Sequence, residues 1–406
     1  MKYLILHAQG FADVPKSDLD GRTPLEAAGT PNMDRLAGEG ELGVAILPTD
    51  GPQGGADVVP VALLGYDPKK VYPGPAPFEA IGLGIAVGEQ DVVYRCNLVT
   101  LRSGNKKPRD LKKLLPTAVM EEAAVCLDVE DARECIDAIN EQLGSETIQF
   151  YPGPGDRHFM VWVNGKAKTT CVNPEEILNR TIGEALPSGD GADILRKLMD
   201  ASIVILSSHP INDQREEAGL KPINAMWLWG QGRSPHLTPL TEERQITGSV
   251  TAMSALHRGV AMAAGLEGID VAAEAEPLDF RTQAEVAVRE LGKKDLVYVH
   301  SAVTNANAQR DDGKAKVSAI EDYDRHLVGP LLQAASQKGH HRVLLVCDGF
   351  IVDVKPPVVP LMPYAFYDSA GRSTSGANRF SAAAHTAQAG ARDATKLMAR
   401  LMPRTA

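Results

Sequence analysis

The stretch Asp295–His300 reads Asp-Leu-Val-Tyr-Val-His, and its β-branched and aromatic residues between polar ends predict a buried β-strand. Two further runs share this character, Tyr3–His7 near the start of the chain and Arg342–Cys347 near its end. Helix-like segments at Gln283–Leu291 and Ile320–Ser336 precede two of the three runs. This alternation predicts an α/β fold with a mostly parallel sheet flanked by helices. In such sheets, functional residues gather at the carboxyl ends of the strands.

A segment of different character, residues 108–179, interrupts this pattern. It contains an amphipathic helix at Val129–Leu143, followed by two alternating strand patterns within residues 147–163. We therefore expect residues 1–107 and 180–406 to form the core domain, with residues 108–179 as a smaller inserted α+β domain.

The composition argues against two classes of binding partner, nucleic acids and membranes. The 406 residues include 42 basic and 52 acidic side chains, a net charge of −10 that repels phosphate backbones, so we expect no nucleic-acid partner. No apolar run approaches the roughly 18 residues that cross a bilayer, so no membrane partner is expected either. The 5 cysteines are odd in number and lack a CxxC spacing, which is typical of reduced thiols in a cytoplasmic protein.

Eight short runs, spread from the first strand to the C-terminal helices, carry a resemblance to a known family. They are Thr23–Ala27 (TPLEA), Thr30–Leu36 (TPNMDRL), Leu63–Pro68 (LLGYDP), Arg95–Thr100 (RCNLVT), Tyr151–Gly153 (YPG), Arg157–His158 (RH), Trp227–Arg233 (WLWGQGR) and Ala319–Asp322 (AIED). In these runs the chain resembles the archaeal-type, cofactor-independent (2,3-bisphosphoglycerate-independent) phosphoglycerate mutases of the alkaline phosphatase superfamily, over essentially its whole length.

The resemblance implies an alkaline-phosphatase-like core with an inserted domain. It also implies the isomerase reaction of glycolysis that interconverts 2- and 3-phosphoglycerate. In that reaction a serine accepts the phosphoryl group and returns it. Two divalent metal ions activate the hydroxyl and neutralise charge on the transferring group.

Several residues that the resemblance assigns to this chemistry are different here. The metal-binding Asp after the first strand is matched by Gln9, and the nucleophilic serine is matched by Ala56. A nearby active-site Asn is matched by Pro60, and a substrate-binding Arg is matched by Pro75. Because alanine has no hydroxyl, the implied phosphoserine cannot form at position 56.

The C-terminal half departs from the family in the same way. Asn305 and Gln309 match an Asp and a His that bind metal, Asp348-Gly349 matches an Asp-His pair, and Val354 matches a final His. Only Asp348 keeps its side-chain type. Hard divalent ions need carboxylate and imidazole ligands, so we expect the chain to bind no metal and no cofactor.

Ten side chains remain as candidates for contact with a ligand. They are His7, Asp57, Arg157, His158, His209, Asn224, Gln231, Arg233, His300 and Asp348. Arg157 and Arg233 would bind a small anion in an inter-domain cleft, while a structural salt bridge is the alternative for Arg157. Buried structural histidines are the alternative for His7 and His300.

Three functions follow from these residues. The leading expectation is a pseudoenzyme that keeps the fold and has a binding, scaffolding or regulatory role, with a small anionic ligand or a protein as its partner. The first alternative is a metal-independent enzyme in the same cleft, with His7, Gln9, His158 and His300 as acid–base or polarising groups. The second is an active mutase whose ligands are not recognised by the pattern.

Overall fold

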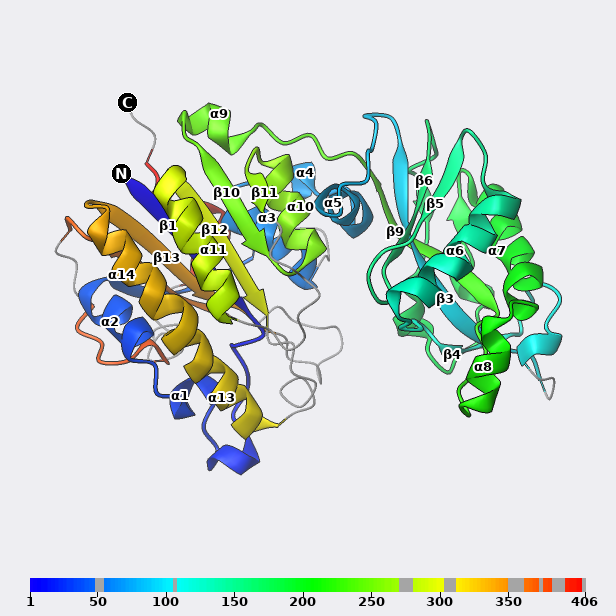
Figure 1. The fold of residues 1–406 in the computed structure, drawn as a ribbon, viewed down its shortest axis with the longest axis horizontal. Coiled ribbons are helices and arrows are strands. Elements are labelled where there is room, and N and C mark those ends of the chain that lie inside the picture. Colours follow the sequence, from blue (N-terminus) through cyan, green and yellow to red (C-terminus); the bar gives the residue numbers. More distant parts are fainter. Residues whose placement is uncertain are drawn as a thin grey trace. The chain divides into compact units, whose positions relative to one another are not determined.

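The chain forms two compact units in the computed structural model, Met1–Tyr72 with His236–Ala406, and Pro73–Pro235 (Figure 1). Each unit has a sheet and a hydrophobic core of its own. The structure describes residues 1–47, 55–104, 108–269, 280–302, 312–349, 361–371, 375–381 and 391–403.

The first unit is built on an eight-stranded sheet with the order β11-β10-β12-β1-β13-β14-β2-β15. β1 (Lys2–Gln9) lies at its centre and runs parallel to β12 (Leu296–Ala302) and β13 (His341–Cys347). The apolar runs Tyr3–His7, Asp295–His300 and Arg342–Cys347 predicted these three strands. The α/β fold with a large, mostly parallel sheet is therefore confirmed. The other strands are β2 (Glu41–Ile46), β10 (Gly248–Ala252), β11 (Glu267–Ile269), β14 (Met362–Asp368), which is antiparallel to its neighbours, and β15 (Arg392–Asp393).

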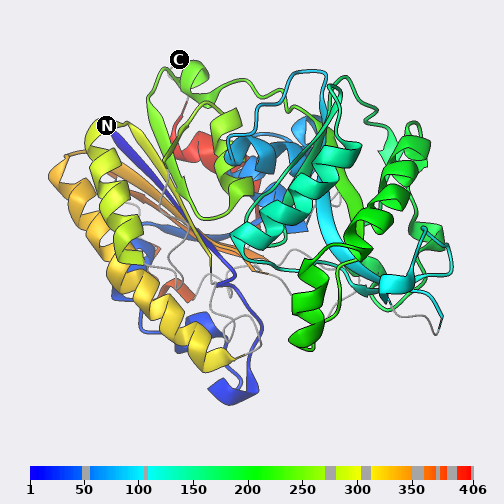
Figure 2. The same ribbon diagram turned by 45° about the vertical axis from the view of Figure 1, so that its right-hand side comes forward.

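Helices cover one face of this sheet (Figures 1 and 2). They are α2 (Pro31–Glu39), α11 (Phe280–Lys293), α13 (Gly313–Tyr323) and α14 (Gly329–Gln337). Side chains alternate between the faces of a strand, so Leu4, Leu6 and Ala8 of β1 pack into the core under these helices. A π-helix at Asp324–Val328 joins α13 to α14, and its buried Asp324 accepts hydrogen bonds from the first backbone amides of α2.

The alternate residues of the central strands point to the opposite face of the sheet. His7 of β1 and Tyr298 and His300 of β12 alternate with the core residues of the first face and are fully buried. α10 (Ala255–Ala263) packs on β10 and β11 and against α3 (Val59–Leu63). The described part of this unit also contains α1 (Pro24–Ala27), α4 (Pro68–Val71), α9 (Leu240–Arg244) and α15 (Leu397–Leu401), with short 3₁₀ turns at Ser17–Leu19, Gly55–Val58 and Ala394–Lys396.

The second unit is an α+β structure around an antiparallel sheet. Its strands are β3 (Val92–Arg102), β4 (Val119–Glu122), β5 (Ile148–Tyr151), β6 (His158–Trp162) and β9 (Ala225–Arg233). α6 (Val129–Leu143) and α7 (Ala192–Ser207) share a core with one face of the sheet, and α5 (Pro75–Gly82) packs on the other. The unit also contains α8 (Ile211–Glu217), the short strands β7 (Thr169–Thr170) and β8 (Ser188–Gly189), and 3₁₀ turns at Pro108–Asp110, Pro174–Ile177 and Gly183–Ala185.

This unit is larger than the inserted segment 108–179 that we expected from the sequence. β3 precedes that segment and β9 follows it, yet the two strands pair with each other, and β3 also pairs with β6. Both strands bury apolar side chains in the core of this unit, including Tyr94 and Trp227. The boundary therefore lies at residues 72–73 and 235–236, where the chain crosses between the two cores.

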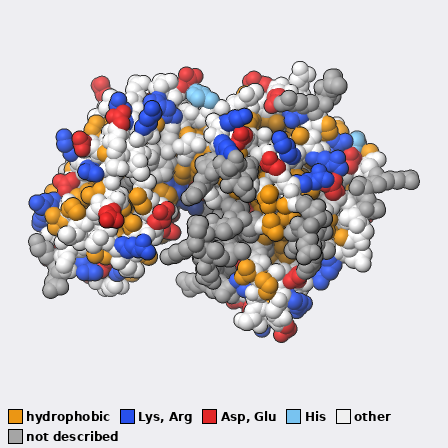
Figure 3. Space-filling view, turned by 180° about the vertical axis from the view of Figure 1, so that it is seen from behind, with side chains coloured by type: hydrophobic (Ala, Val, Ile, Leu, Met, Phe, Trp, Pro, Cys, Tyr) orange, Lys and Arg blue, Asp and Glu red, His pale blue; other side chains and the backbone are white. Residues whose placement is uncertain are grey.

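The surface is mixed in character. On the face shown in Figure 3, basic and acidic side chains are intermingled with scattered apolar ones. None of the helices that the structure describes combines the length and the apolar character needed to cross a lipid bilayer.

Candidate functional site

The carboxyl ends of β1, β12 and β13 bring polar side chains together in the first unit. The parallel register places His7 beside His300 and Gln9 beside Ala302, and Asp348 follows β13 directly. His7 and His300 are 0% exposed and Asp348 is 1% exposed. Three of the side chains singled out in the sequence thus meet at one edge of the sheet, as expected for an α/β fold.

His7 links two neighbouring strands through its ring nitrogens. Its Nε2 lies 3.0 Å from Oδ2 of Asp348, and its Nδ1 lies 2.9 Å from the hydroxyl of Tyr298. The other carboxylate oxygen of Asp348 accepts a hydrogen bond of 3.2 Å from the backbone amide of Gly10. Burial, and then the charge of Asp348, raise the pKa of Tyr298 well above its ordinary value. Both oxygens of Asp348 are therefore engaged within the protein.

Two further imidazoles complete the cluster. His257 of α10 stacks on His300 with ring centroids 3.5 Å apart and an interplanar angle of 14°, and each ring lies 5.1 Å from that of His7. His300 contacts Gln9 through Nε2 at 3.1 Å, while its carbonyl oxygen accepts from the amide of Gln283. Burial, and then the neighbouring His7, lower the pKa of His300 well below its ordinary value.

His257 was not among the site residues predicted from the sequence. It lies within a nine-residue helix of mostly small and apolar side chains, and it belongs to no motif. A single histidine in such a helix is indistinguishable from a packed core residue, because the contact with His300 depends on tertiary packing. No local signal would have found it.

The metal pair implied by the family does not fit the side chains described at this edge. Asp348, which would bind a metal, is committed to His7 and Gly10, and the amide oxygen of Gln9 is committed to His300. A Cβ at position 349 would overlap the carbonyl oxygen of Ala12, whose amide donates to the carbonyl of Asp348 at 3.0 Å. The backbone at Gly349 therefore leaves no room for an imidazole.

Four predicted positions cannot be placed in this geometry. Asn305, Gln309 and Val354 lie outside the described residues, and so does the side chain of Ala56, whose backbone is part of the 3₁₀ turn Gly55–Val58. Asp57 is in the same turn and accepts a long hydrogen bond of 3.5 Å from Tyr72.

Six of the ligand candidates belong to the second unit, where their contacts are internal. Asn224 bonds to both the amide and the carbonyl of Leu101 at 2.8 and 2.7 Å. Gln231 donates to the carbonyl of Thr169, and Arg233 donates to Gln90. His209 accepts from the amide of Ile211 at 3.3 Å. These contacts hold strands and turns of the unit in place.

Arg157 lies beside a buried carboxylate. Glu79 is 1% exposed and forms two short bonds with Arg95, 2.6 Å to Nε and 2.8 Å to Nη2, while Nη1 of Arg157 lies 3.9 Å away. The guanidinium of Arg95 also lies over the ring of Trp229, 4.7 Å from its centroid. The Arg157 side chain is 50% exposed. The salt-bridge alternative for Arg157 is therefore present in the structure, although Arg95 is the stronger partner of Glu79.

His158 is fully buried in β6. Its Nδ1 accepts from the amide of Gly153 at 3.2 Å, and its Nε2 has no hydrogen-bond partner among the described residues. Burial lowers the pKa of His158 to about 4. The ring is therefore neutral at physiological pH.

The free energy of unfolding should fall as the pH is lowered from 6.5 towards 4. The pKa of His158 is lowered from 6.5 to about 4 in the folded state, so the unfolded chain binds more protons in this window. The stabilisation is complete above pH 6.5 and is lost as the pH falls through the folded pKa; His300 acts in the same direction. Urea titrations at about pH 7 and about pH 4.5 measure the decrease in the free energy of unfolding between these two pH values. This decrease should be roughly 2 kcal/mol smaller for His158→Gln than for the unmodified protein.

The control for this measurement is His236→Gln, because His236 is exposed in the first unit. This variant should keep the whole pH dependence. A His158→Gln protein with the same pH dependence as the control would contradict the assignment to His158.

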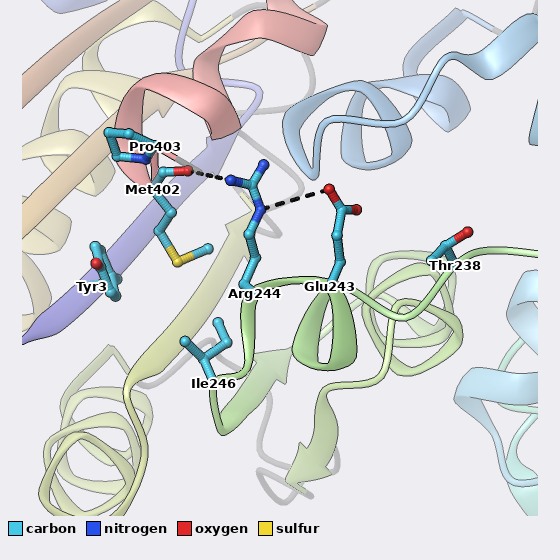
Figure 4. Close-up of a pocket in the computed structure, with 7 residues that line it drawn as sticks. All are labelled: Tyr3, Thr238, Glu243, Arg244, Ile246, Met402 and Pro403. Atoms are coloured by element: carbon cyan, nitrogen blue, oxygen red, sulfur yellow. Dashed lines mark hydrogen bonds and ion pairs between the residues drawn. The ribbon is translucent and has the colours of Figure 1, made fainter. Parts of the chain in front are cut away.

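The first unit also has a surface pocket of about 560 Å³ (Figure 4). Its lining includes Tyr3, at the opposite end of β1 from Gln9, and Arg244. Arg244 donates to the carbonyl of Met402 at 2.6 Å, and its Nε lies 4.0 Å from the carboxylate of Glu243. The pocket is at the amino end of the strand, so it is separate from the polar cluster.

Comparisons with known proteins agree with the fold and with the family resemblance. The model of the family described as 2,3-bisphosphoglycerate-independent phosphoglycerate mutase matches residues 37–212. A probable mutase of this name from Geobacter sulfurreducens is 36% identical over 86% of each chain, and one from Methanosarcina barkeri is 34% identical over 90% of each.

Two solved structures share the fold. One, from Pyrococcus horikoshii, matches with a TM-score of 0.78 and 24% identity, covering 100% of this chain and 98% of that one. The other is a cofactor-independent phosphoglycerate mutase from Thermoplasma acidophilum, with a TM-score of 0.64, 25% identity and 99% of each chain covered. With relatives above 30% identity along most of its length, the chain belongs to the 2,3-bisphosphoglycerate-independent phosphoglycerate mutase family.

Proposed function

We propose that this chain is a cytoplasmic pseudoenzyme of the family, which keeps the fold but does not hold the metal pair or transfer a phosphoryl group. The observation that carries the proposal is the conformation of Asp348-Gly349 at the end of β13. The resemblance assigns this pair to metal binding. Here the pair is in a closed state, in which Asp348 is hydrogen-bonded to the loop that follows β1 and Gly349 packs directly against Ala12 of that loop.

Three hydrogen bonds support this closed state. Asp348 bonds through its side chain to His7 and to the amide of Gly10, and its backbone amide donates to the carbonyl of Ala8 at 3.0 Å. A buried carboxylate with such partners is already stabilised without a cation. A metal ion would have to displace them, which costs free energy because each buried donor would lose its acceptor.

The residues at the positions assigned to the nucleophile and to a metal ligand support the proposal independently. Ala56 offers no oxygen, and Gln9 offers a neutral amide where the resemblance assigns a carboxylate. Groups that act together in catalysis lose nearly all of their effect when one is removed. Here the positions that the resemblance assigns to the nucleophile and to every metal ligand except Asp348 carry other residues.

The role that we propose for the chain is binding, with a small anion or a partner protein as the ligand. Arg157 supports this role because Arg95 forms the two short bonds with Glu79, while Nη1 of Arg157 lies 3.9 Å from that carboxylate, beyond hydrogen-bond distance. A half-exposed guanidinium can bind a carboxylate or phosphate group with two parallel hydrogen bonds. The expected effect of Arg157→Gln is weaker binding of such an anion, measured by calorimetry with inorganic phosphate; unchanged binding would contradict this role for Arg157.

The purified protein should bind neither Mn²⁺ nor Mg²⁺ in stoichiometric amounts. No folding free energy then comes from these ions, so the melting temperature should be the same with Mn²⁺, with Mg²⁺ and with a chelator. Elemental analysis after dialysis, combined with thermal melts, makes the measurement. A content of about two Mn²⁺ or Mg²⁺ ions per chain after dialysis would contradict the proposal.

One observation favours a metal-independent enzyme as a second candidate. Asp348, His7 and the hydroxyl of Tyr298 form a hydrogen-bonded chain in the order carboxylate, imidazole, hydroxyl, which is the order found in acyl-transfer triads. Tyr298 is 0% exposed and its pKa is raised, so its hydroxyl is poorly suited to attack a substrate. An activated-phosphonate probe should leave Tyr298 unlabelled in mass spectrometry; labelling there would favour this candidate over the pseudoenzyme.

A further inference from the structure

We propose that His7, His257 and His300 form a binding site for one transition-metal ion of the class that prefers imidazole, such as Zn²⁺, Co²⁺ or Ni²⁺. The site differs from the metal pair of the mutases in its residues, in its number of ions and in the kind of ion. It does not depend on the proposed loss of mutase activity.

The three histidines come from three elements that converge on the same face of the sheet. His7 is in β1, His257 in α10 and His300 in β12, and each offers a ring nitrogen that lies within 4.8 Å of those of the other two. Their side chains are enclosed, since the residues are 0%, 1% and 0% exposed. An ion that prefers imidazole ligands is compatible with three rings enclosed in this way.

His300 points to a missing partner. Its Nε2 faces the amide oxygen of Gln9 at 3.1 Å and so carries the proton, which leaves a lone pair on Nδ1. This Nδ1 is buried and has no hydrogen-bond donor among the residues that the structure describes. A buried acceptor without a donor is destabilising, and a metal ion would satisfy it. Burial also keeps His300 neutral, the form in which imidazole binds a metal.

His7 has the outer contact that metal-binding histidines commonly make. Its Nε2 lies 3.0 Å from the carboxylate of Asp348, an arrangement that orients the ring and makes the other nitrogen a better ligand. That other nitrogen, Nδ1, now faces the hydroxyl of Tyr298 at 2.9 Å. An ion bound to Nδ1 would replace this hydrogen bond and would lie beside the tyrosine oxygen.

Binding requires the rings to move by a small amount. His257 and His300 are stacked nearly parallel, at an angle of 14°, so their nitrogens do not yet point at a common centre. With Zn–N bonds of about 2.1 Å, nitrogens in a tetrahedral site lie roughly 3.4 Å apart. The nitrogens here lie within 4.8 Å of one another, so binding would require ring rotations that close this difference.

The chemistry of the donors selects the ion. Three neutral imidazoles suit Zn²⁺, Co²⁺, Ni²⁺ and Cu²⁺, whereas Mg²⁺ and Mn²⁺ prefer oxygen ligands. We therefore revise our expectation of a metal-free chain, but only for Zn²⁺, Co²⁺, Ni²⁺ and Cu²⁺. Exclusion of Mn²⁺ and Mg²⁺ remains part of the pseudoenzyme proposal.

Titration of the full-length protein with Co²⁺ tests the site, because visible absorption reports the coordination of this ion. We expect one Co²⁺ per chain, with the strong absorption of a low-coordinate nitrogen site, and competition by Zn²⁺. His257→Gln should weaken binding by at least the roughly 100-fold that outer-shell changes can reach. The control His236→Gln replaces an exposed histidine of the same unit and should bind Co²⁺ like the unmodified protein.

The absence of Co²⁺ binding to the unmodified protein would overturn the inference, and so would equal affinity in the folded His257→Gln variant. Circular dichroism without metal establishes whether that variant folds. If the His257→Gln variant does not fold, the test rests on the Co²⁺ stoichiometry and the Co²⁺ spectrum of the unmodified protein. A weak spectrum typical of octahedral Co²⁺ would exclude the three-histidine site. Failure here leaves the pseudoenzyme proposal intact, because that proposal is tested by mutase turnover and by Mn²⁺ and Mg²⁺ binding.

Discussion

Replacing Gly349 by histidine, the residue that the family resemblance assigns to this position, should destabilise the first unit by about 3 kcal/mol or more. A Cβ at this position would overlap the carbonyl oxygen of Ala12. The two segments are also joined by the bond from the amide of Ala12 to the carbonyl of Asp348, at 3.0 Å. Relief of the overlap therefore requires backbone movement and the loss of a buried hydrogen bond. Urea unfolding followed by circular dichroism measures the change.

Gly349→Ala isolates the cause, because the Cβ alone produces the overlap and should account for most of the loss. The matched control is Gly292→Ala in α11, where nothing lies within 4 Å of the added carbon. In a helix this change should be neutral or stabilising by up to about 1 kcal/mol. A Gly349→Ala protein as stable as the unmodified one would show that the end of β13 is more open than described here.

Restoring the nucleophile alone should give no mutase activity. In Ala56→Ser the new hydroxyl would still lack the cations that lower its pKa and neutralise the transferring phosphoryl group. Loss of one member of a catalytic unit can cost about 10⁶-fold in rate, so a lone serine should remain at background. A coupled assay for the conversion of 3- to 2-phosphoglycerate measures this, and intact-protein mass spectrometry measures phosphoserine.

Activity should require all of the groups that the resemblance assigns to the mutase chemistry. On the sequence alone these are Gln9→Asp, Ala56→Ser, Asn305→Asp, Gln309→His, Gly349→His and Val354→His. The structure adds an obstacle, because the change at Gly349 also requires the loop at Ala12 to move. Pro75 would still stand where the resemblance places a substrate-binding Arg. Phosphoserine or turnover in the single Ala56→Ser variant would contradict this account.

The central strands could be predicted because their signal is local. The alternation of Leu4, Leu6 and Ala8 with Ile5 and His7 follows from a strand buried on both faces, and β12 and β13 carry similar apolar runs. The extent of the second unit could not be predicted in the same way. β3 and β9 read as generic strands, and only their pairing, across more than a hundred residues of chain, assigns them to that unit.

The candidate site was predicted only in part for a similar reason. Parallel strands have a known polarity, so His7, His300 and Asp348 could be expected at one edge of the sheet. His257 enters from a helix packed on the same face, and no spacing in the sequence relates it to His300. The overlap at Gly349 depends on where the loop after β1 passes, which is a property of tertiary packing.

The most direct test of the central claim is phosphoglycerate mutase turnover by the unmodified protein, purified from a host whose own mutase has been removed. We predict no interconversion of 2- and 3-phosphoglycerate above background, with or without added Mn²⁺. Sustained turnover that co-purifies with this chain through successive columns would contradict the pseudoenzyme account.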